Sequence, residues 1–294
     1  MGTHSSTLLP PALDPSIQDK LTAVIDRLAE FGSIMVAFSG GVDSALVLRA
    51  ALAAVPGNVL AATGLSASYA EEEIAEAKAV AAQLGAPHIM VETMELTDPR
   101  YADNTHQRCF FCKTELYGKM QAKAAELGFD TIVDGTNADD LGDFRPGLRA
   151  ANQLNVVSPL AEAGMTKSDI RAAARAWGVP IWNKPAAACL SSRFQYGDPI
   201  TVAKLRQVAT AETGLRRLGF KGFRVRHHDE TARLEIPLDQ FPLVLEHQSA
   251  IVDAVRQAGY RYVTLDLEGF RSGSMNEVLN ARVKSTGLRR SSTD

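Results

Sequence analysis

Residues 34–44 have the sequence IMVAFSGGVDS, in which a short apolar run leads directly into a turn rich in glycine, serine and aspartate. A continuous apolar run of this length is typical of a strand buried in a parallel sheet. Apolar residues recur at helical spacing before the run, over residues 17–32, and a helical stretch follows the turn from Ala45 to Val55. We therefore expect a helix, a buried strand, a turn and a second helix in this order.

The alternation of strands and helices continues toward the C-terminus. Short apolar runs predict strands at 58–64, 88–92 and 131–134, and the segments 70–84 and 114–127 have helical character. Strands that alternate with helices indicate a parallel sheet with helices on both faces, which is an α/β fold. Ligands bind such sheets at the carboxyl ends of the strands, where glycine, serine, aspartate and asparagine residues of this chain are concentrated.

The pattern changes after about residue 195, where the order α-β-β-α-β predicts a small α+β domain. Its elements are a helix over 201–218, strands over 223–227 and 232–236, a helix over 243–258 and a strand over 262–267. We expect four parts in the chain. They are a flexible N-terminus (1–14), an α/β domain (15–195), an α+β domain for substrate binding and oligomerisation (196–275), and a disordered polar tail (276–294).

The composition excludes several classes of protein. The 294 residues carry a net charge of −3, and 46% of them are hydrophobic, as in soluble globular proteins. The slight acidic excess disfavours a nucleic-acid partner, and no apolar run approaches the ~20 residues of a membrane helix. The N-terminus lacks a secretory signal, and three cysteines are an odd set for a disulfide framework. We expect a cytoplasmic protein with reduced thiols and no membrane contact.

The turn after the first predicted strand has the features of an anion-binding loop. Gly40 and Gly41 permit positive φ angles, so that backbone N–H groups converge on an oxyanion at a helix N-terminus. Ser39 and Ser44 add hydroxyl donors, while Asp43 offers oxygen ligands for Mg²⁺ or braces the loop. A plain strand-to-helix turn explains one glycine and one cap, but not SGG and DS together. The chain lacks GxxxxGK[ST] and GxGxxG, so other nucleotide loops are not indicated.

The segment SGGVDS at 39–44 resembles the SGGxDS motif of the PP-loop ATP pyrophosphatase superfamily. This resemblance implies a parallel-sheet, HUP-like nucleotide-binding domain that splits ATP into AMP and pyrophosphate and adenylates a substrate oxygen. Gly135, Thr136 and Asn137 fit the same superfamily, because they follow a predicted strand and suit a ribose or Mg²⁺. Turn formation and helix capping explain these residues equally well.

A later segment with the sequence SPL, followed by Lys167, also resembles the superfamily. The resemblance implies that this lysine approaches the α-phosphate of ATP. Taken alone, Lys167 would be an ordinary exposed lysine at the start of a helix.

The three cysteines form a CxxC pair, Cys109 and Cys112 in RCFFCK, and a distant Cys189 in KPAAACLSSRF. Thiolates suit zinc or an iron–sulfur cluster. Four ligands normally close a structural zinc site, for which His106 is a candidate, whereas three thiolates on a cubane cluster leave one iron open. A buried thiol at Cys112 and a thioredoxin-like pair remain alternatives.

The segments RCFFCK, DGTNADDLGDFRPG, KPAAACLSSRF and FRVRHHD resemble the LarE family of ATP-dependent sulfur transferases, and the similarity runs over about residues 15–275. The family matures the nickel-pincer cofactor of lactate racemase. It adenylates the carboxylates of pyridinium-3,5-biscarboxylic acid mononucleotide and converts them to thiocarboxylates. The resemblance implies that Cys189 delivers the sulfur, with Asp43 and Cys189 as the catalytic residues.

The sulfur source divides this family. Single-cysteine members give up the thiol sulfur of the cysteine that matches Cys189. In a second branch, three cysteines matching Cys109, Cys112 and Cys189 hold a 4Fe–4S cluster whose open iron carries the transferred sulfide. The resemblance therefore implies ATP, Mg²⁺ and a 4Fe–4S cluster as cofactors, with sacrifice of Cys189 as the alternative. We also expect sulfide or a cysteine desulfurase as the sulfur source, and a homo-oligomer.

The predicted second domain carries charged residues suited to an anion. Arg224 and Arg226 alternate on one face of a predicted strand, and paired guanidinium groups suit a phosphate or carboxylate. Solvated edge-strand charges explain them as well. The resemblance implies that Glu212 and Glu235 lie near this pair and bind metal or phosphate-linked ions. Arg193 could lower a thiol pKa, hold the substrate phosphate or be a surface arginine.

Three other functions remain open from the sequence. A tRNA thiolation enzyme also combines a PP-loop with a CxxC pair and a lone cysteine, but it requires a broad basic surface that the net charge disfavours. An ammonia-using synthetase of the GMP- or NAD-synthetase type needs no cysteine trio. A nucleotide sensor would bind ATP without turnover.

Overall fold

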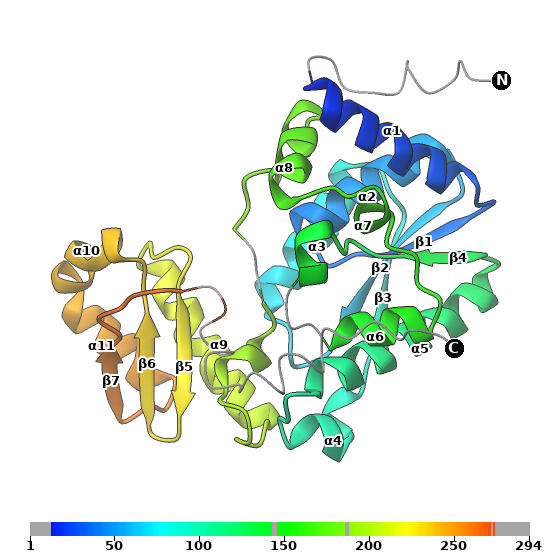
Figure 1. The fold of residues 1–294 in the computed structure, drawn as a ribbon. Coiled ribbons are helices and arrows are strands. Elements are labelled where there is room, and N and C mark those ends of the chain that lie inside the picture. Colours follow the sequence, from blue (N-terminus) through cyan, green and yellow to red (C-terminus); the bar gives the residue numbers. More distant parts are fainter. Residues whose placement is uncertain (1–12, 143–145, 186–187, 272, 274–294) are drawn as a thin grey trace.

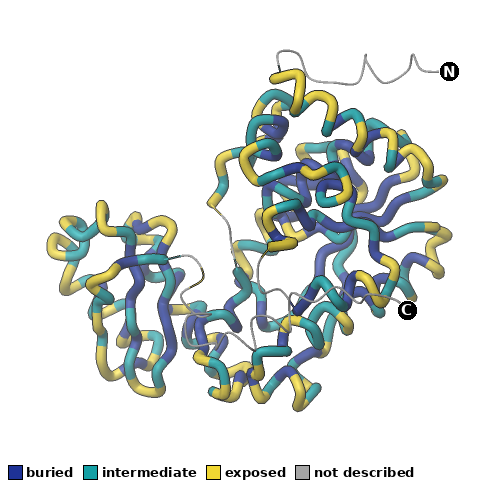
Figure 2. The backbone as a smooth tube through the Cα atoms, in the orientation of Figure 1, coloured by how far each residue is buried: buried dark blue, intermediate teal, exposed yellow. Residues whose placement is uncertain are grey.

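The computed structural model describes residues 13–142, 146–185, 188–271 and 273. A larger body is built on a four-stranded sheet and a smaller body on a three-stranded sheet (Figure 1). Most strand residues of both sheets are buried or half-buried, except in the last strand of the smaller sheet, and exposed residues concentrate on the outer helices and the loops (Figure 2). The predicted N-terminal lead-in up to residue 12 and the predicted tail from residue 276 lie outside the described residues.

The expected strand, turn and helix are confirmed. Helix α1 (Pro15–Ala29) begins with proline in its first turn and is capped by Asp14, whose side chain accepts a hydrogen bond from the Ser16 backbone nitrogen. Strand β1 (Ile34–Ala37) follows, and α2 (Val42–Ala54) starts directly after the glycine pair. The helix therefore begins three residues earlier than Ala45, so Asp43 lies in its first turn.

The larger sheet is parallel throughout and has the strand order β3-β2-β1-β4. Its other strands are β2 (Val59–Leu65), β3 (His88–Glu92) and β4 (Thr131–Val133). Because β1 is a central strand, both of its edges are paired, and Val36 lies opposite both Ala61 of β2 and Val133 of β4. The prediction of an α/β fold with a parallel sheet is confirmed.

Helices cover both faces of this sheet. On one face, Ile34 and Val36 pack in a core with α1, α2, α3 (Glu71–Gln83) and α8 (Lys167–Ala176). On the other face, Met35 packs with α5 (Arg108–Leu127) and α6 (Gly147–Gln153). Shorter helical segments complete the body: η1 (Glu95–Thr97), α4 (Pro99–Ala102), η2 (Ala138–Gly142), α7 (Pro159–Glu162) and η3 (Leu190–Arg193).

The predicted start of helix α5 at Thr114 is wrong. The helix begins at Arg108, so Cys109 and Cys112 lie within its first two turns and not in a preceding loop. No side chain caps this end of the helix, which explains why the sequence gives no start signal there. The buried Arg108 side chain ties the first turn to the rest of the protein instead.

The smaller body has the predicted order of elements. Helix α9 (Val202–Arg217) precedes a sheet of order β5-β6-β7, in which β5 and β6 are antiparallel and β6 and β7 are parallel. The strands are β5 (Arg224–His228), β6 (Thr231–Glu235) and β7 (Tyr262–Leu265). The single helix expected over 243–258 is instead two, α10 (Phe241–Glu246) and α11 (Gln248–Gln257), because the backbone at His247 leaves helical geometry; the short η4 (Leu238–Gln240) precedes α10.

The two bodies share a hydrophobic core. Leu190 and Phe194, which precede the predicted domain boundary, pack in one cluster with Val225 and Leu234 of the smaller sheet. Phe194 also forms an isolated parallel bridge with His227, and their rings lie 5.0 Å apart. Packing therefore continues across residue 195, and the boundary stays a prediction. Within the described residues, no helix is long and apolar enough to cross a membrane.

Replacing Phe194 with alanine tests the shared core. The Phe194 side chain is fully buried, so F194A is expected to lower the free energy of unfolding by about 3–5 kcal/mol, measured by chemical denaturation. Leu238→Ala is the control, because Leu238 is 60% exposed and its loss should change stability by less than about 0.5 kcal/mol. Equal effects of the two substitutions would contradict a core that spans both bodies.

Candidate active site

The loop after β1 uses its two glycines differently. Gly40 adopts a φ of +70°, and a Cβ there would lie 2.9 Å from the Cβ of Ala77 in α3, so a side chain is excluded by both conformation and space. Gly41 has a φ of −90° and forms the N-cap of α2. The expectation of positive φ angles therefore holds for Gly40 and is wrong for Gly41.

The serine hydroxyls brace this loop from within. Ser44 Oγ lies 3.1 Å from Ser39 Oγ and donates to the Gly41 carbonyl at 3.1 Å. The Gly41 backbone nitrogen donates to Ser39 Oγ at 3.3 Å. Among the described residues, no side-chain hydrogen bond caps α2, so the backbone N–H groups of its first turn can bind an anion. The loop has the construction that a phosphate site requires.

The loop after β4 forms the facing wall. A Cβ at Gly135 would lie 2.7 Å from the Ser44 backbone nitrogen, so this position requires glycine. Two residues later, Asn137 Nδ2 donates to Asp43 Oδ2 at 3.0 Å. Burial raises the pKa of Asp43, and nearby Asp140 raises it further, although Asn137 opposes the shift. Two carboxylates facing a buried space suit a divalent cation.

Asp134, at the end of β4, organises the same wall. It accepts hydrogen bonds from the Thr136 backbone nitrogen at 3.0 Å, from Ser158 Oγ at 2.8 Å and from Tyr117 Oη at 2.7 Å. Burial alone would raise the pKa of Asp134, but Lys113 and these hydrogen bonds hold it below the ordinary value. Thr136 is therefore fixed by Asp134 at the edge of the cavity.

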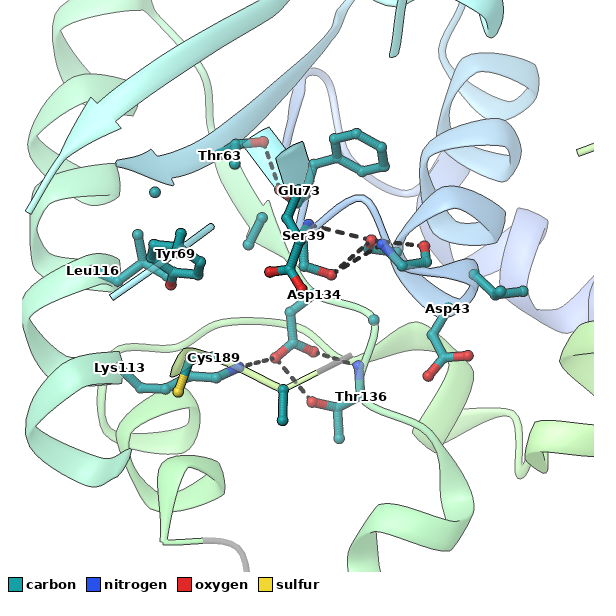
Figure 3. Close-up of a pocket in the computed structure, with 18 of the residues that line it drawn as sticks. Ser39, Asp43, Thr63, Tyr69, Glu73, Lys113, Leu116, Asp134, Thr136 and Cys189 are labelled. Carbon is teal, nitrogen blue, oxygen red and sulfur yellow. Dashed lines mark hydrogen bonds and ion pairs between the residues drawn. The ribbon is translucent and has the colours of Figure 1, made fainter. Parts of the chain in front are cut away.

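A cavity of about 390 Å³ opens at this edge of the sheet (Figure 3). It brings together most of the residues predicted to bind nucleotide, and Cys189 lines it too. Gly40 and Asn137 act on the lining residues: Gly40 sets the conformation of the loop after β1, and Asn137 donates a hydrogen bond to Asp43. The lining residues from the predicted set are Ser39, Gly41, Asp43, Ser44, Gly135, Thr136, Lys167 and Cys189.

Basic side chains surround the cavity. Lys167, the first residue of α8, lies with its Nζ 3.4 Å from Asp140 Oδ1. Lys113, Arg171 and Lys184 line the same cavity and were missed by sequence analysis, because a single basic residue carries no periodic signal. The available clue was proximity to the cysteines, because Lys113 directly follows Cys112 and Lys184 lies five residues before Cys189.

Glu73, in the first turn of α3, is an acidic lining residue that the sequence did not single out. Burial raises its pKa, although Arg193 and Lys184 oppose the shift. The cavity thus has the Glu73 carboxyl group in the same lining as the phosphate-binding loop and the sulfur end, which is the part of the cavity lined by Cys189. Only the fold brings this residue there, because α3 carries three consecutive glutamates with no distinguishing pattern.

The three cysteines lie close enough together to influence one another. All are free thiols, with Cys109 exposed and Cys112 and Cys189 half-buried. Burial raises the pKa of Cys189, and the neighbouring Cys109 raises it further, whereas Arg108 lowers it. Burial raises the pKa of Cys112 as well, with added contributions from Glu95, Cys189 and Cys109.

These thiols fit an iron–sulfur cluster in the kind and number of donors, because three soft thiolates leave one iron open. Their positions do not form a metal site as they stand: in the described part of the chain, no group of three or more His, Cys, Asp or Glu side chains is arranged to hold a metal ion. The CxxC pair is not joined in a disulfide.

Arg193 holds the turn that carries Cys189. Its Nε and Nη2 bond to the two carboxylate oxygens of buried Glu212 at 2.8 and 2.9 Å. Its Nη1 donates to the carbonyls of Ala188 at 2.6 Å and Cys189 at 3.1 Å. The Arg193 guanidinium group therefore makes its hydrogen bonds within the protein, and Glu212 is its counter-ion.

The predicted arginine pair lies beside this turn. Arg226 is 1% exposed, with Nη2 2.7 Å from Glu235 Oε2 and Nη1 donating to the Ser192 carbonyl at 2.5 Å. Arg224 stacks on Phe270, and burial, together with the nearby charges of Arg193 and Arg226, lowers its pKa to about 10. The structure brings all five predicted substrate-binding residues into one cluster, in which Arg224 lies near the like charges of Arg193 and Arg226.

Known proteins are similar to this chain in sequence. A family model for asparagine synthase matches residues 17–121, which include the phosphate-binding loop. The chain is 38% identical over 266 residues to pyridinium-3,5-bisthiocarboxylic acid mononucleotide synthase of Lactiplantibacillus plantarum, with 90% of this chain and 96% of that enzyme covered. It is 42% identical to an uncharacterized protein of Synechocystis, with 90% and 99% covered. A tRNA-specific 2-thiouridylase of Leptospira interrogans matches about half of each chain at 28% identity.

The parallel sheet, the SGGVDS loop and the cavity beyond it define a PP-loop enzyme that uses ATP. Similarity to the Lactiplantibacillus synthase extends through both bodies of the structure. The chain belongs to the LarE family of ATP-dependent sulfur transferases.

Two glycine-to-alanine substitutions test the close approach of the loop after β4 to the loop after β1. Gly135→Ala places a methyl group against backbone, which must push the loops apart, so we expect the KM for ATP to rise roughly tenfold because the loops no longer hold their relative geometry. Gly118→Ala is the matched control: Gly118 lies within α5 with no atom near the added Cβ, and alanine there should stabilise by up to about 1 kcal/mol. Steady-state kinetics would contradict the argument if G135A kept the normal KM.

Proposed function

We propose that this chain adenylates the carboxylates of pyridinium-3,5-biscarboxylic acid mononucleotide and converts them to thiocarboxylates, as a step in maturing the nickel-pincer cofactor of lactate racemase. The observation that carries the proposal is that the phosphate-binding loop and Cys189 line one cavity. A reaction that first activates an acid with ATP and then adds sulfur requires these two functions side by side. The name of the Lactiplantibacillus relative supports the same substrate and product.

The first half-reaction uses the residues around the phosphate-binding loop. Free backbone N–H groups at the start of α2 would hold the β,γ-pyrophosphate, with Ser39 and Ser44 keeping the loop in shape. Asp43 would hold Mg²⁺ against the phosphates, oriented by Asn137, and Lys167 would neutralise the α-phosphate. A substrate carboxylate oxygen then bonds to the α-phosphorus, and the bond to the pyrophosphate oxygen breaks.

The second half-reaction uses the sulfur end of the cavity. A carboxylate resists nucleophiles because its charge is delocalised, but its adenylate has AMP as a leaving group. A sulfur nucleophile bonds to the acyl carbon, the bond from that carbon to the AMP oxygen breaks, and the thiocarboxylate leaves with AMP. Cys189 is the cysteine that lines the cavity, so sulfur would be delivered from its position.

The arginine cluster of the smaller body supports recognition of the substrate phosphate. Arg224 has no carboxylate in direct contact among the described ion pairs, and burial together with the nearby charges of Arg193 and Arg226 lowers its pKa. A phosphate dianion would relieve this repulsion and gain charge-assisted hydrogen bonds. Glu212 and Glu235 would then act through the arginines that they hold in place.

We propose that Cys109, Cys112 and Cys189 hold a 4Fe–4S cluster. When bound, such a cluster supplies an open iron that carries a transferable sulfide, so the protein keeps its own thiols through repeated turnovers. The presence of three free thiols that interact electrostatically favours this source over sacrifice of Cys189, which would leave dehydroalanine. Sulfide would reload the sulfur directly, or a cysteine desulfurase would do so together with a two-electron reductant, because persulfide sulfur must be reduced to sulfide. Reduced thiols suit a cytoplasmic protein, and we expect a homo-oligomer.

A tRNA thiolation activity is the second candidate, supported by the half-length similarity to the 2-thiouridylase. The net charge of −3 weighs against it, because tRNA binding relies on phosphate neutralisation by basic residues. Retention of tRNA by protein washed in high salt would favour thiolation of tRNA and contradict the mononucleotide proposal.

The main prediction concerns turnover. Anaerobic incubation of the cluster-loaded chain with ATP, Mg²⁺ and the pyridinium mononucleotide should release AMP and pyrophosphate and raise the product mass by about 16 Da per carboxylate, since sulfur replaces oxygen. Asp43→Asn should lower AMP release roughly 100-fold, because it removes a charge that holds Mg²⁺. The exposed Asp19→Asn is the control. AMP release without any mass change would contradict sulfur transfer to this substrate.

A separate prediction concerns the sulfur source. Anaerobic reconstitution should give broad charge-transfer absorption and about four irons per chain, and Cys109→Ala should abolish both by removing one of three ligands. Treatment with a chelator should stop repeated turnover. Loss of one sulfur from Cys189 after a single turnover, detected by mass spectrometry, would instead show sacrifice of that residue.

A further inference from the structure

Arg108 joins the start of α5 to the turn that carries Cys189. The residue is 4% exposed, and its Nη1 donates to the Ser191 carbonyl at 2.8 Å and to Asn104 Oδ1 at 2.5 Å. Arg108 directly precedes Cys109 in the chain, and Ser191 lies in the turn two residues after Cys189. A single hydrogen bond therefore connects the two cysteine segments directly.

Further buried contacts hold Arg108 in place. Asn104 is fully buried and has a φ of +52°, a left-handed conformation that asparagine tolerates better than most residues. Its amide accepts the bond from Arg108 and donates from Nδ2 to the Gln195 carbonyl at 2.5 Å. Tyr101 Oη also lies 2.6 Å from Ser191 Oγ. The guanidinium group is thus fixed where the two cysteine segments meet.

The positive charge of Arg108 has no carboxylate partner among the described ion pairs. Its two acceptors, the Ser191 carbonyl and the Asn104 amide oxygen, are neutral, and its buried Nε has no hydrogen-bond partner in the described part of the protein. Arg193, by contrast, is paired with Glu212. A buried charge without a counter-charge is costly, so an anion next to Arg108 would stabilise this region.

The anions available next to Arg108 are cysteine thiolates. Burial lowers the pKa of Arg108, but the thiolates of Cys109 and Cys189 outweigh this effect and raise it above the ordinary value. Glu95 is a buried acid near Cys112, but its described hydrogen bonds come from two serine hydroxyls and not from Arg108. Negative charge on the cysteine sulfur atoms is therefore what this guanidinium group compensates.

We propose that Arg108 is a positioning residue and the counter-ion of the sulfur end of the cavity. It aligns the CxxC segment with Cys189, and its unpaired charge stabilises anionic sulfur at Cys189. This inference rests on the sulfur-delivering role of Cys189 in the proposed function. It adds the protein group whose charge would favour loading of this position with sulfur in anionic form.

The test compares two alkylating reagents of different charge, in the iron-free, full-length chain at low ionic strength. Iodoacetate is an anion and iodoacetamide is neutral, but both react with the same thiolate. The ratio of their rates at Cys189, resolved by peptide mass spectrometry, therefore reports the local potential, because the thiolate fraction cancels. Arg108→Gln should lower this ratio by roughly fivefold or more, since a positive charge near Cys189 is lost. Arg108→Lys should keep the ratio within about twofold, because lysine retains the charge.

Arg149→Gln is the matched control. Arg149 also contacts the start of α5, since its Nη1 lies 3.4 Å from Gln107 Oε1 and its guanidinium group stacks 4.8 Å from the centre of the Phe110 ring. No described hydrogen bond or ion pair joins it to the turn that carries Cys189. The ratio at Cys189 in this variant should equal that of the unmodified protein.

Asn104→Asp tests the same charge if circular dichroism shows that Arg108→Gln does not fold. Aspartate gives the guanidinium group a carboxylate partner at the position of the present amide, so the ratio at Cys189 should fall here too. An unchanged ratio in either folded variant would overturn the proposal, because Arg108 would then only fasten the two segments. The measurement uses no ATP, mononucleotide or iron, so its failure is distinguishable from failure of the proposed sulfur transfer.

Discussion

The loop after β4 passes so close to the start of α2 that a Cβ at Gly135 would meet the Ser44 backbone nitrogen at 2.7 Å. This approach is possible because β1 and β4 are parallel neighbours, so the segments that follow these two strands leave the sheet at the same edge. It brings Asn137 within 3.0 Å of Asp43 and places the Asp134 network beside the phosphate-binding loop. The geometry of the nucleotide end of the cavity follows from this backbone contact.

The position of the turn that carries Cys189, at the sulfur end of the cavity, depends on two buried ion pairs. Arg193 with Glu212 and Arg226 with Glu235 are ion pairs whose members are all nearly inaccessible to water. Such pairs gain little over apolar packing, but loss of one partner leaves an uncompensated buried charge, typically at a cost of about 3–5 kcal/mol. Both arginines also donate to carbonyls of the turn from Ala188 to Ser192. The pairs therefore serve more to fix this turn than to stabilise the fold.

Local sequence was sufficient for the parts of the structure that local forces determine. The apolar run at 34–38, the glycine turn and the helix after it were predictable because strand burial and loop conformation act within a dozen residues. The start of α5 at Arg108 was not, since a buried arginine rather than a cap fixes it. Glu73 and Lys184 reach the cavity only through tertiary packing. Glu73 carries no pattern that distinguishes it from surface residues, and the available clue for Lys184 is its position five residues before Cys189.

The core shared by the two bodies limits how the chain can be rearranged. Leu190 and Phe194 belong by sequence to the larger body but pack with the smaller one, and the residue before Leu190 is Cys189. A chimaera that exchanged the C-terminal unit with that of a relative at residue 195 would leave these apolar side chains facing a foreign surface. A viable exchange has to include both residues, so the turn that carries Cys189 and the cluster of Arg193, Arg224 and Arg226 would be inherited as one module.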